Sequence, residues 1–152
     1  MTPLTLRRRQ TVPSLRSIAA GGRQRDNVQL FLLHGPSCPG CARIAAELAA
    51  HRQELEAWGG EVLVLHEEET AFADLPFRQE RDPGGRTRRA FGGADADAVI
   101  ACLDFRGLLM DGWALRHPEP VDWHEVAETA RWVAVQEPEC GTCVIAPGWD
   151  EE

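Results

Sequence analysis

Two apolar runs separated by an amphipathic segment constrain this fold more than any other feature of the sequence. The runs cover residues 28–33 and 61–66, and each has the length and apolarity of a buried strand. Between them, residues 42–58 place apolar side chains at helical spacing, and Gly59-Gly60 follows as a helix terminator. We therefore predict a strand–helix–strand unit with parallel strands and a right-handed crossover.

Two cysteines stand where the first predicted strand meets the helix, in the motif Cys38-Pro39-Gly40-Cys41. A helix N-terminus directs free N–H groups and the positive end of the helix dipole toward the first thiol, which favours the thiolate. Pro39 suits the first helical turn because no N–H is needed there, and Gly40 adds backbone freedom. The second thiol lies one turn further on, so this layout suits thiol–disulfide exchange.

The rest of the chain predicts four more elements, two strands of the sheet and two helices. A turn at residues 82–85 precedes a short helix over 86–91. Residues 99–103 and 108–114 form a predicted hairpin around Asp104-Phe105-Arg106-Gly107. A last amphipathic helix covers 123–135 and begins with a capping box of Asp122 and Glu125. This order predicts an α/β fold with a mixed central β-sheet flanked by helices on both faces.

We divide the chain into three parts. Residues 1–26 form an Arg-rich N-terminal extension with a candidate edge strand at 12–18. Residues 27–136 form the main domain, and residues 137–152 form a C-terminal tail with a second Cys-x-x-Cys motif. A length of 152 residues is sufficient for one domain with a sizeable core.

Composition, charge and the distribution of apolar residues argue against several functions and against a membrane or secreted location. The formal net charge of −8 disfavours nucleic acid as a partner. All 16 basic residues are arginines, so Schiff-base chemistry through lysine is excluded. No apolar run approaches the roughly 18 residues of a membrane span, and the basic N-terminus is followed by no secretory apolar stretch. We predict a cytoplasmic protein without membrane or nucleic-acid partners.

Three segments, in this order, resemble the thioredoxin-like superfamily and within it the redoxins, the peroxiredoxin-like (AhpC/TSA-like) proteins. Residues 31–41 resemble their active-site strand and turn. Residues 75–92 contain a similar Asp-Pro-x-Gly pattern, and residues 102–107 resemble their strand and hairpin. The resemblance covers roughly residues 28–135. It implies a thioredoxin-like fold and an antioxidant type of oxidoreductase that works without a bound organic cofactor.

Two features of the sequence depart from the pattern of that superfamily. Ala98 stands at the place where most members have a cis-proline beside the reactive cysteine. Gly35 and Phe31 stand where peroxiredoxins have the Thr or Ser and the Pro that precede their reactive cysteine. The hydroxyl that would position peroxide is therefore missing from that place, which favours disulfide exchange over peroxide reduction.

The resemblance and the helix position assign roles to the first cysteine pair. We predict Cys38 as the nucleophile and Cys41 as the resolving thiol. His34 is a candidate proton acceptor or a cover over the site, and Arg43 is a candidate source of positive potential; both are also explained as ordinary surface residues. The predicted partners are a protein or small-molecule disulfide or peroxide and an external thiol reductant, and the oligomeric state stays open.

The second pair, Cys140-Gly141-Thr142-Cys143, leaves three interpretations open. It could be a second redox pair that relays electrons to the first, a zinc knuckle, or a structural disulfide or idle thiols in the tail. For an oxidoreductase no metal is predicted; zinc enters only in the alternatives that use Cys140 and Cys143, by themselves or together with the first pair. Cys102 lies among apolar residues of a predicted strand and is interpreted as a small buried hydrophobe.

Three functions are therefore compatible with the sequence. The first is a thiol–disulfide oxidoreductase that uses Cys38 and Cys41. The second is a thiol peroxidase in which peroxide oxidises Cys38 and Cys41 resolves the product. The third, of a different class, is a non-catalytic zinc-binding or redox-sensing module that uses both cysteine pairs.

Overall fold

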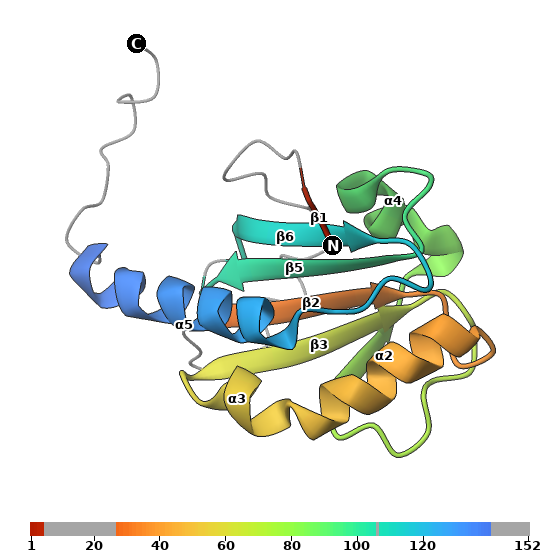
Figure 1. Ribbon diagram of the computed structural model, residues 1–152, viewed down its shortest axis with the longest axis horizontal. Helices are drawn as coiled ribbons and strands as arrows, with labels where there is room; N and C mark the ends of the chain where they lie inside the picture. Colours follow the sequence, from red (N-terminus) through yellow and green to blue (C-terminus); the bar gives the residue numbers. More distant parts are fainter. Residues whose placement is uncertain (5–26, 106, 141–152) are drawn as a thin grey trace, which may run out of the picture.

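The protein is built around one mixed β-sheet (Figure 1). The computed structural model describes residues 1–4, 27–105 and 107–140, and side chains up to residue 135. In these residues the sheet has six strands in the order β1-β6-β5-β2-β3-β4. The strands are β1 (Thr2–Pro3), β2 (Asn27–Leu33), β3 (Gly60–His66), β4 (Arg78–Arg81), β5 (Ala98–Asp104) and β6 (Leu109–Leu115).

The predicted parallel and antiparallel pairings are both confirmed. Strand β2 pairs in parallel with β3, and β5 forms an antiparallel hairpin with β6. Strand β5 also pairs with β2 in antiparallel register, so that β2 is fully buried at the centre of the sheet. The alternation of side chains along a strand then supplies apolar residues to both faces.

Helices cover both faces of the sheet, as predicted. One face carries α2 (Pro39–Ala50), α3 (Arg52–Glu56) and α5 (Trp123–Cys140) (Figure 1). Buried apolar side chains of these helices pack against those of the sheet. On the other face Phe91 of α4 (Arg86–Gly92) packs against residues of β2, β3 and β5. A short 3-10 helix, η1 (Pro83–Gly85), leads into α4.

Three elements differ from the prediction. The helix expected over 42–58 is divided into α2 and α3 at His51, whose φ of −96° and ψ of 11° leave the helical region and whose ring stacks on Trp123. Strand β4 lies in a stretch expected to be a connection, because its four residues are polar and show no apolar alternation. Helix α5 continues past the predicted end at 135 to Cys140, so the proposed boundary at 137 falls inside it.

The N-terminal edge strand lies at Thr2–Pro3, where it pairs with β6. The candidate strand at 12–18 lies outside the described residues. The capping box is confirmed in its first half, since Asp122 Oδ1 accepts the N–H of Glu125 at 3.0 Å. Among the helices of the described segments, none combines the length and the apolarity that crossing a membrane requires.

Candidate active site

One edge of the sheet gathers residues that are far apart in the sequence. The C-terminal ends of the parallel strands β2 and β3 meet there, with Leu33 beside His66. The start of β5 and the end of β6 reach the same edge, because Val99 pairs with Leu32 of β2 and Ala98 pairs with Leu115. The loops that follow β2, β3 and β6, and the loop that precedes β5, therefore converge on the first turn of α2.

Cys38 and Cys41 lie at this edge on the first turn of α2. Cys38 is the N-cap residue, and its Sγ accepts the backbone N–H of Cys41 at 3.4 Å. Pro39 occupies the first helical turn, as predicted, where its missing N–H costs nothing. Both cysteines are free thiols, and Cys38 is partly exposed whereas Cys41 is buried.

The thiol of Cys41 has a raised pKa. Burial raises the pKa of the Cys41 thiol to about 12, and the neighbouring Cys38 sulfur adds to this rise. The backbone N–H of His34 donates to Cys41 Sγ at 3.3 Å and acts in the opposite direction. Cys41 is thus a protonated thiol in the resting site, and Cys38 is the partly exposed residue of the pair.

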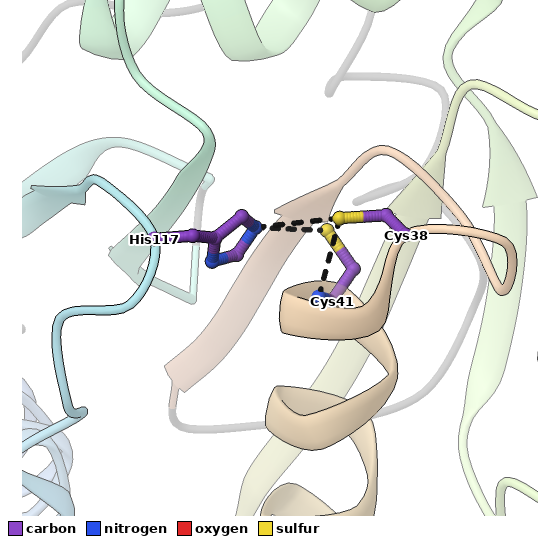
Figure 2. A group of neighbouring side chains, drawn as sticks. All are labelled: Cys38, Cys41 and His117. Atoms are coloured by element: carbon purple, nitrogen blue, oxygen red, sulfur yellow. Dashed lines mark hydrogen bonds between the residues drawn. The ribbon is translucent and has the colours of Figure 1, made fainter.

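His117 contacts both sulfurs, and the sequence analysis missed it. Its Nε2 lies 3.4 Å from Cys38 Sγ and 3.5 Å from Cys41 Sγ (Figure 2). The residue belongs to the loop after β6 and is 79 positions from Cys38. The His117–Pro118 peptide bond is cis, whereas Ala98, at the place expected for a cis-proline, lies fully buried at the start of β5.

The orientation of the His117 ring follows from its surroundings. The backbone N–H of His117 donates to Asp97 Oδ2 at 2.9 Å, which holds the loop to the start of β5. Within the described residues the buried Nδ1 atom has no hydrogen-bond partner, so the polar contacts of the ring run through Nε2 to the sulfurs. Burial lowers the pKa of His117, which favours the neutral imidazole.

Gly40 makes the approach of His117 possible. A Cβ atom at this position would lie 2.3 Å from Nδ1 and 2.4 Å from Cγ of the His117 ring. Real Cβ atoms do not approach other atoms so closely, so any other residue at position 40 would push the ring away. The glycine of the Cys-x-x-Cys motif therefore has a steric role, in place of the backbone freedom that the sequence suggested.

His34 lies at the site but its ring faces carboxylates. Its Nδ1 is 2.9 Å from Glu67 Oε2, and its Nε2 is 3.9 Å from Asp97 Oδ1. Glu67 in turn pairs with the buried Arg88 at 3.0 Å. His34 therefore contributes its backbone N–H to Cys41, while its ring joins the loops after β2 and β3 to the start of β5.

Arg43 is held by two contacts on the same side of α2. Its guanidinium donates to Glu47 Oε1 and to the backbone carbonyl of Glu119, both at 2.9 Å. Because Glu119 belongs to the loop that carries His117, Arg43 ties this loop to α2. The positive charge of Arg43 also acts on His117, where it contributes to the lowered pKa.

The loop before Cys38 explains one departure from the peroxiredoxin pattern. A Cβ atom at Gly35 would lie 2.4–2.7 Å from side-chain carbons of Glu68. The Glu68 carboxylate accepts the backbone N–H of Ser37 at 3.2 Å and also the hydroxyl of Ser37. The side chain of Glu68 thus fills the place that a Thr or Ser at position 35 would need.

Of the remaining cysteines, Cys102 has a described side chain, and it lies outside this cluster. Cys102 is fully buried in β5, as predicted, and its Sγ accepts an N–H of Gln29 at 3.2 Å. Burial raises the pKa of Cys102 to about 12. Cys140 ends α5 without a described side chain, and Cys143 lies outside the described residues, so a second redox pair stays a prediction.

Comparison with known proteins identifies the fold. No protein family model matches the sequence, and no curated protein matches it. A yeast mitochondrial 1-Cys peroxiredoxin matches with a TM-score of 0.68 and 11% identity over 89% of this chain and 79% of that chain. AhpC from Enterococcus faecalis matches with a TM-score of 0.60 and 12% identity over 76% and 78% of the two chains.

A third solved structure adds a different activity on the same architecture. A secreted thiol-disulfide isomerase from Corynebacterium glutamicum matches with a TM-score of 0.57 and 22% identity over 72% of this chain and 71% of that chain. At these identities the likeness concerns the fold, which agrees with the resemblance drawn from the sequence. The chain has an α/β thioredoxin-like fold, with the Cys38–Cys41 pair at the N-terminus of the helix that follows the central strand.

Proposed function

We propose that this protein is a thiol–disulfide oxidoreductase that cycles between a Cys38–Cys41 dithiol and the corresponding disulfide. The observation that carries the proposal is the cluster of an accessible Cys38 sulfur, a buried Cys41 sulfur and His117 Nε2 at 3.4–3.5 Å from both. The structural relatives, which include a thiol-disulfide isomerase and peroxiredoxins, support thiol redox chemistry in general.

The proposed reaction has two displacement steps. The Cys38 thiolate attacks a substrate disulfide, forms a mixed disulfide and releases one substrate thiolate. Cys41 then gives up its proton, attacks the Cys38 sulfur and releases the second substrate thiolate. Two electrons pass from the protein to the substrate, and an external thiol reductant restores the dithiol.

His117 has a specific place in the second step. The Cys41 thiol is protonated at rest because burial raises its pKa. A neutral imidazole 3.5 Å from Cys41 Sγ can accept that proton as the sulfur attacks. The same Nε2 can later deliver the proton to the departing thiolate, because it also lies 3.4 Å from Cys38 Sγ.

The test is to trap the mixed disulfide with glutathione disulfide as substrate. All proteins carry Cys140→Ser and Cys143→Ser, so that the thiols of the second pair do not contribute. We expect Cys41→Ser to accumulate one glutathione per chain on Cys38, measured by intact mass spectrometry. We expect Cys38→Ser to accumulate none, and Cys102→Ala, the control, to form the Cys38–Cys41 disulfide like the parent.

Two results would remove this proposal. One is Cys38→Ser reducing glutathione disulfide at the parent rate, and the other is Cys41→Ser failing to trap the adduct. A parallel arm replaces glutathione disulfide with hydrogen peroxide. Disulfide formation that is much faster with peroxide than with glutathione disulfide would favour the peroxidase alternative instead.

A further inference from the structure

We propose that the reduced form of this protein binds a thiophilic metal ion of the Zn²⁺ class through Cys38 Sγ, Cys41 Sγ and His117 Nε2. The three atoms lie within 4.8 Å of one another; two come from the first turn of α2, and the third comes from the loop after β6. Two thiolates with one imidazole form a ligand set that zinc accepts, with a fourth position left for water or an external ligand.

The two sulfur-to-nitrogen distances agree with tetrahedral coordination. Zinc lies about 2.3 Å from sulfur and about 2.0–2.1 Å from nitrogen ligands. At a tetrahedral angle those bonds place sulfur and nitrogen about 3.5 Å apart. The observed separations from His117 Nε2 are 3.4 Å to Cys38 Sγ and 3.5 Å to Cys41 Sγ, so the nitrogen needs no movement relative to either sulfur.

Backbone hydrogen bonds and the space beside Gly40 hold the three ligand atoms in place. The backbone N–H of Cys41 donates to Cys38 Sγ and that of His34 donates to Cys41 Sγ (Figure 2 shows the first contact). The imidazole can occupy its position because Gly40 has no side chain, since a Cβ there would overlap the ring. The partial exposure of Cys38 leaves the fourth coordination position accessible.

Metal binding and disulfide formation exclude each other at this site. Binding of one divalent ion requires both sulfurs as thiolates and releases the protons that the thiols carried. Oxidation joins the same two sulfurs and removes both ligands. The inference therefore uses the sulfurs of the proposed function but does not depend on it, because coordination requires no substrate disulfide.

This site differs from the zinc alternative drawn from the sequence. That alternative used both Cys-x-x-Cys pairs, about a hundred residues apart, or the pair in the tail. The third ligand here is a histidine from the loop after β6, so the second pair is not required. Replacing Cys140 and Cys143 should leave the affinity unchanged.

The experiment titrates reduced, metal-free full-length protein with Co²⁺ and then displaces Co²⁺ with Zn²⁺. The parent carries Cys140→Ser and Cys143→Ser. We expect one Co²⁺ per chain, with a thiolate-to-cobalt charge-transfer band, and no band for the oxidised protein. His117→Ala should weaken Zn²⁺ binding by more than the roughly 10–100-fold that loss of a supporting residue costs a metal site.

Matched controls separate ligand loss from unfolding. His124→Ala removes an exposed histidine of α5 and should bind like the parent. Gly40→Ala keeps all three ligands but displaces the imidazole, so it should weaken binding in a chain that retains its His117. Far-UV circular dichroism checks the fold of each variant.

The proposal is overturned if the parent shows no charge-transfer band or if His117→Ala and Gly40→Ala both bind Zn²⁺ like His124→Ala. These outcomes are independent of the glutathione trapping, which is carried out with a chelator present. Thiol–disulfide exchange without metal binding would support the proposed function and overturn the metal site. Metal binding without exchange would leave a metal site on a thioredoxin-like fold.

Discussion

Gly40→Ala is the substitution that tests the site most directly. The new Cβ would start 2.3 Å from His117 Nδ1, whereas ordinary van der Waals contacts begin at 3.4 Å, so the ring must retreat by about 1.1 Å. A retreat of that size away from α2 carries Nε2 beyond hydrogen-bond distance of both sulfurs, which now lie at 3.4 and 3.5 Å.

The backbone itself accepts alanine at this position. Gly40 lies inside α2 and is not among the glycines with a positive φ. In a helix alanine is favoured over glycine by up to about 1 kcal/mol. Forcing a methyl group into an occupied space costs about 1–3 kcal/mol. Gly40→Ala should therefore destabilise the parent slightly but should be neutral or stabilising once the His117 ring has been removed.

A double-mutant cycle with His117→Ala measures this coupling. The free energy of unfolding comes from urea denaturation of the reduced parent, both single variants and the double variant. Neighbouring residues that compete for space typically couple by about 0.5–3 kcal/mol. Equal effects of Gly40→Ala in the two backgrounds would show that the ring does not occupy this space, and the geometry of the site would be wrong.

Three further predictions concern parts of the fold that support the site. Arg88→Met leaves Glu67 without its buried partner, so urea denaturation should show a loss of about 3 kcal/mol; a loss below 1 kcal/mol would mean that solvent already screens this pair. Cys102, fully buried and with its pKa raised to about 12, should not react with a thiol reagent at pH 8 until urea unfolds the chain; labelling of Cys102 in native protein, mapped by peptide mass spectrometry, would contradict its burial. Asp122→Ala removes the acceptor for the N–H of Glu125 at the start of α5 and should cost about 1 kcal/mol, whereas Asp122→Asn should restore most of it; equal stability of the two variants would argue against the cap.

The role of the second cysteine pair, Cys140 and Cys143, can be tested by removing both thiols. Cys140 ends α5 and Cys143 follows three residues later, outside the described part of the chain. The measurement compares the rate at which the Cys140→Ser/Cys143→Ser parent and the unmodified chain reduce glutathione disulfide, each with an external thiol reductant. A large loss would favour the electron-relay interpretation, and an unchanged rate would favour structural or idle thiols.

The local features of this protein were determined by its sequence. The apolar runs of β2 and β3 predict buried parallel strands, because such strands need apolar side chains on both faces. The Cys-Pro-Gly-Cys motif places the first thiol at a helix N-terminus, because the strand, the turn and the proline are contiguous. The hairpin of β5 and β6 was predictable for the same reason, since its turn joins neighbouring segments.

The tertiary structure alone decided which groups meet at the sulfurs. His34, the nearest histidine in the sequence, turns its ring to Glu67, whereas His117 reaches Cys38 from 79 positions away. His117 reaches the sulfurs because of the order of strands in the sheet, which brings the end of β6 beside the start of β5 and the end of β2. Contacts between distant segments leave no periodic signal in a single sequence. The sequence also does not show that the His117 ring occupies the space where a side chain at Gly40 would lie.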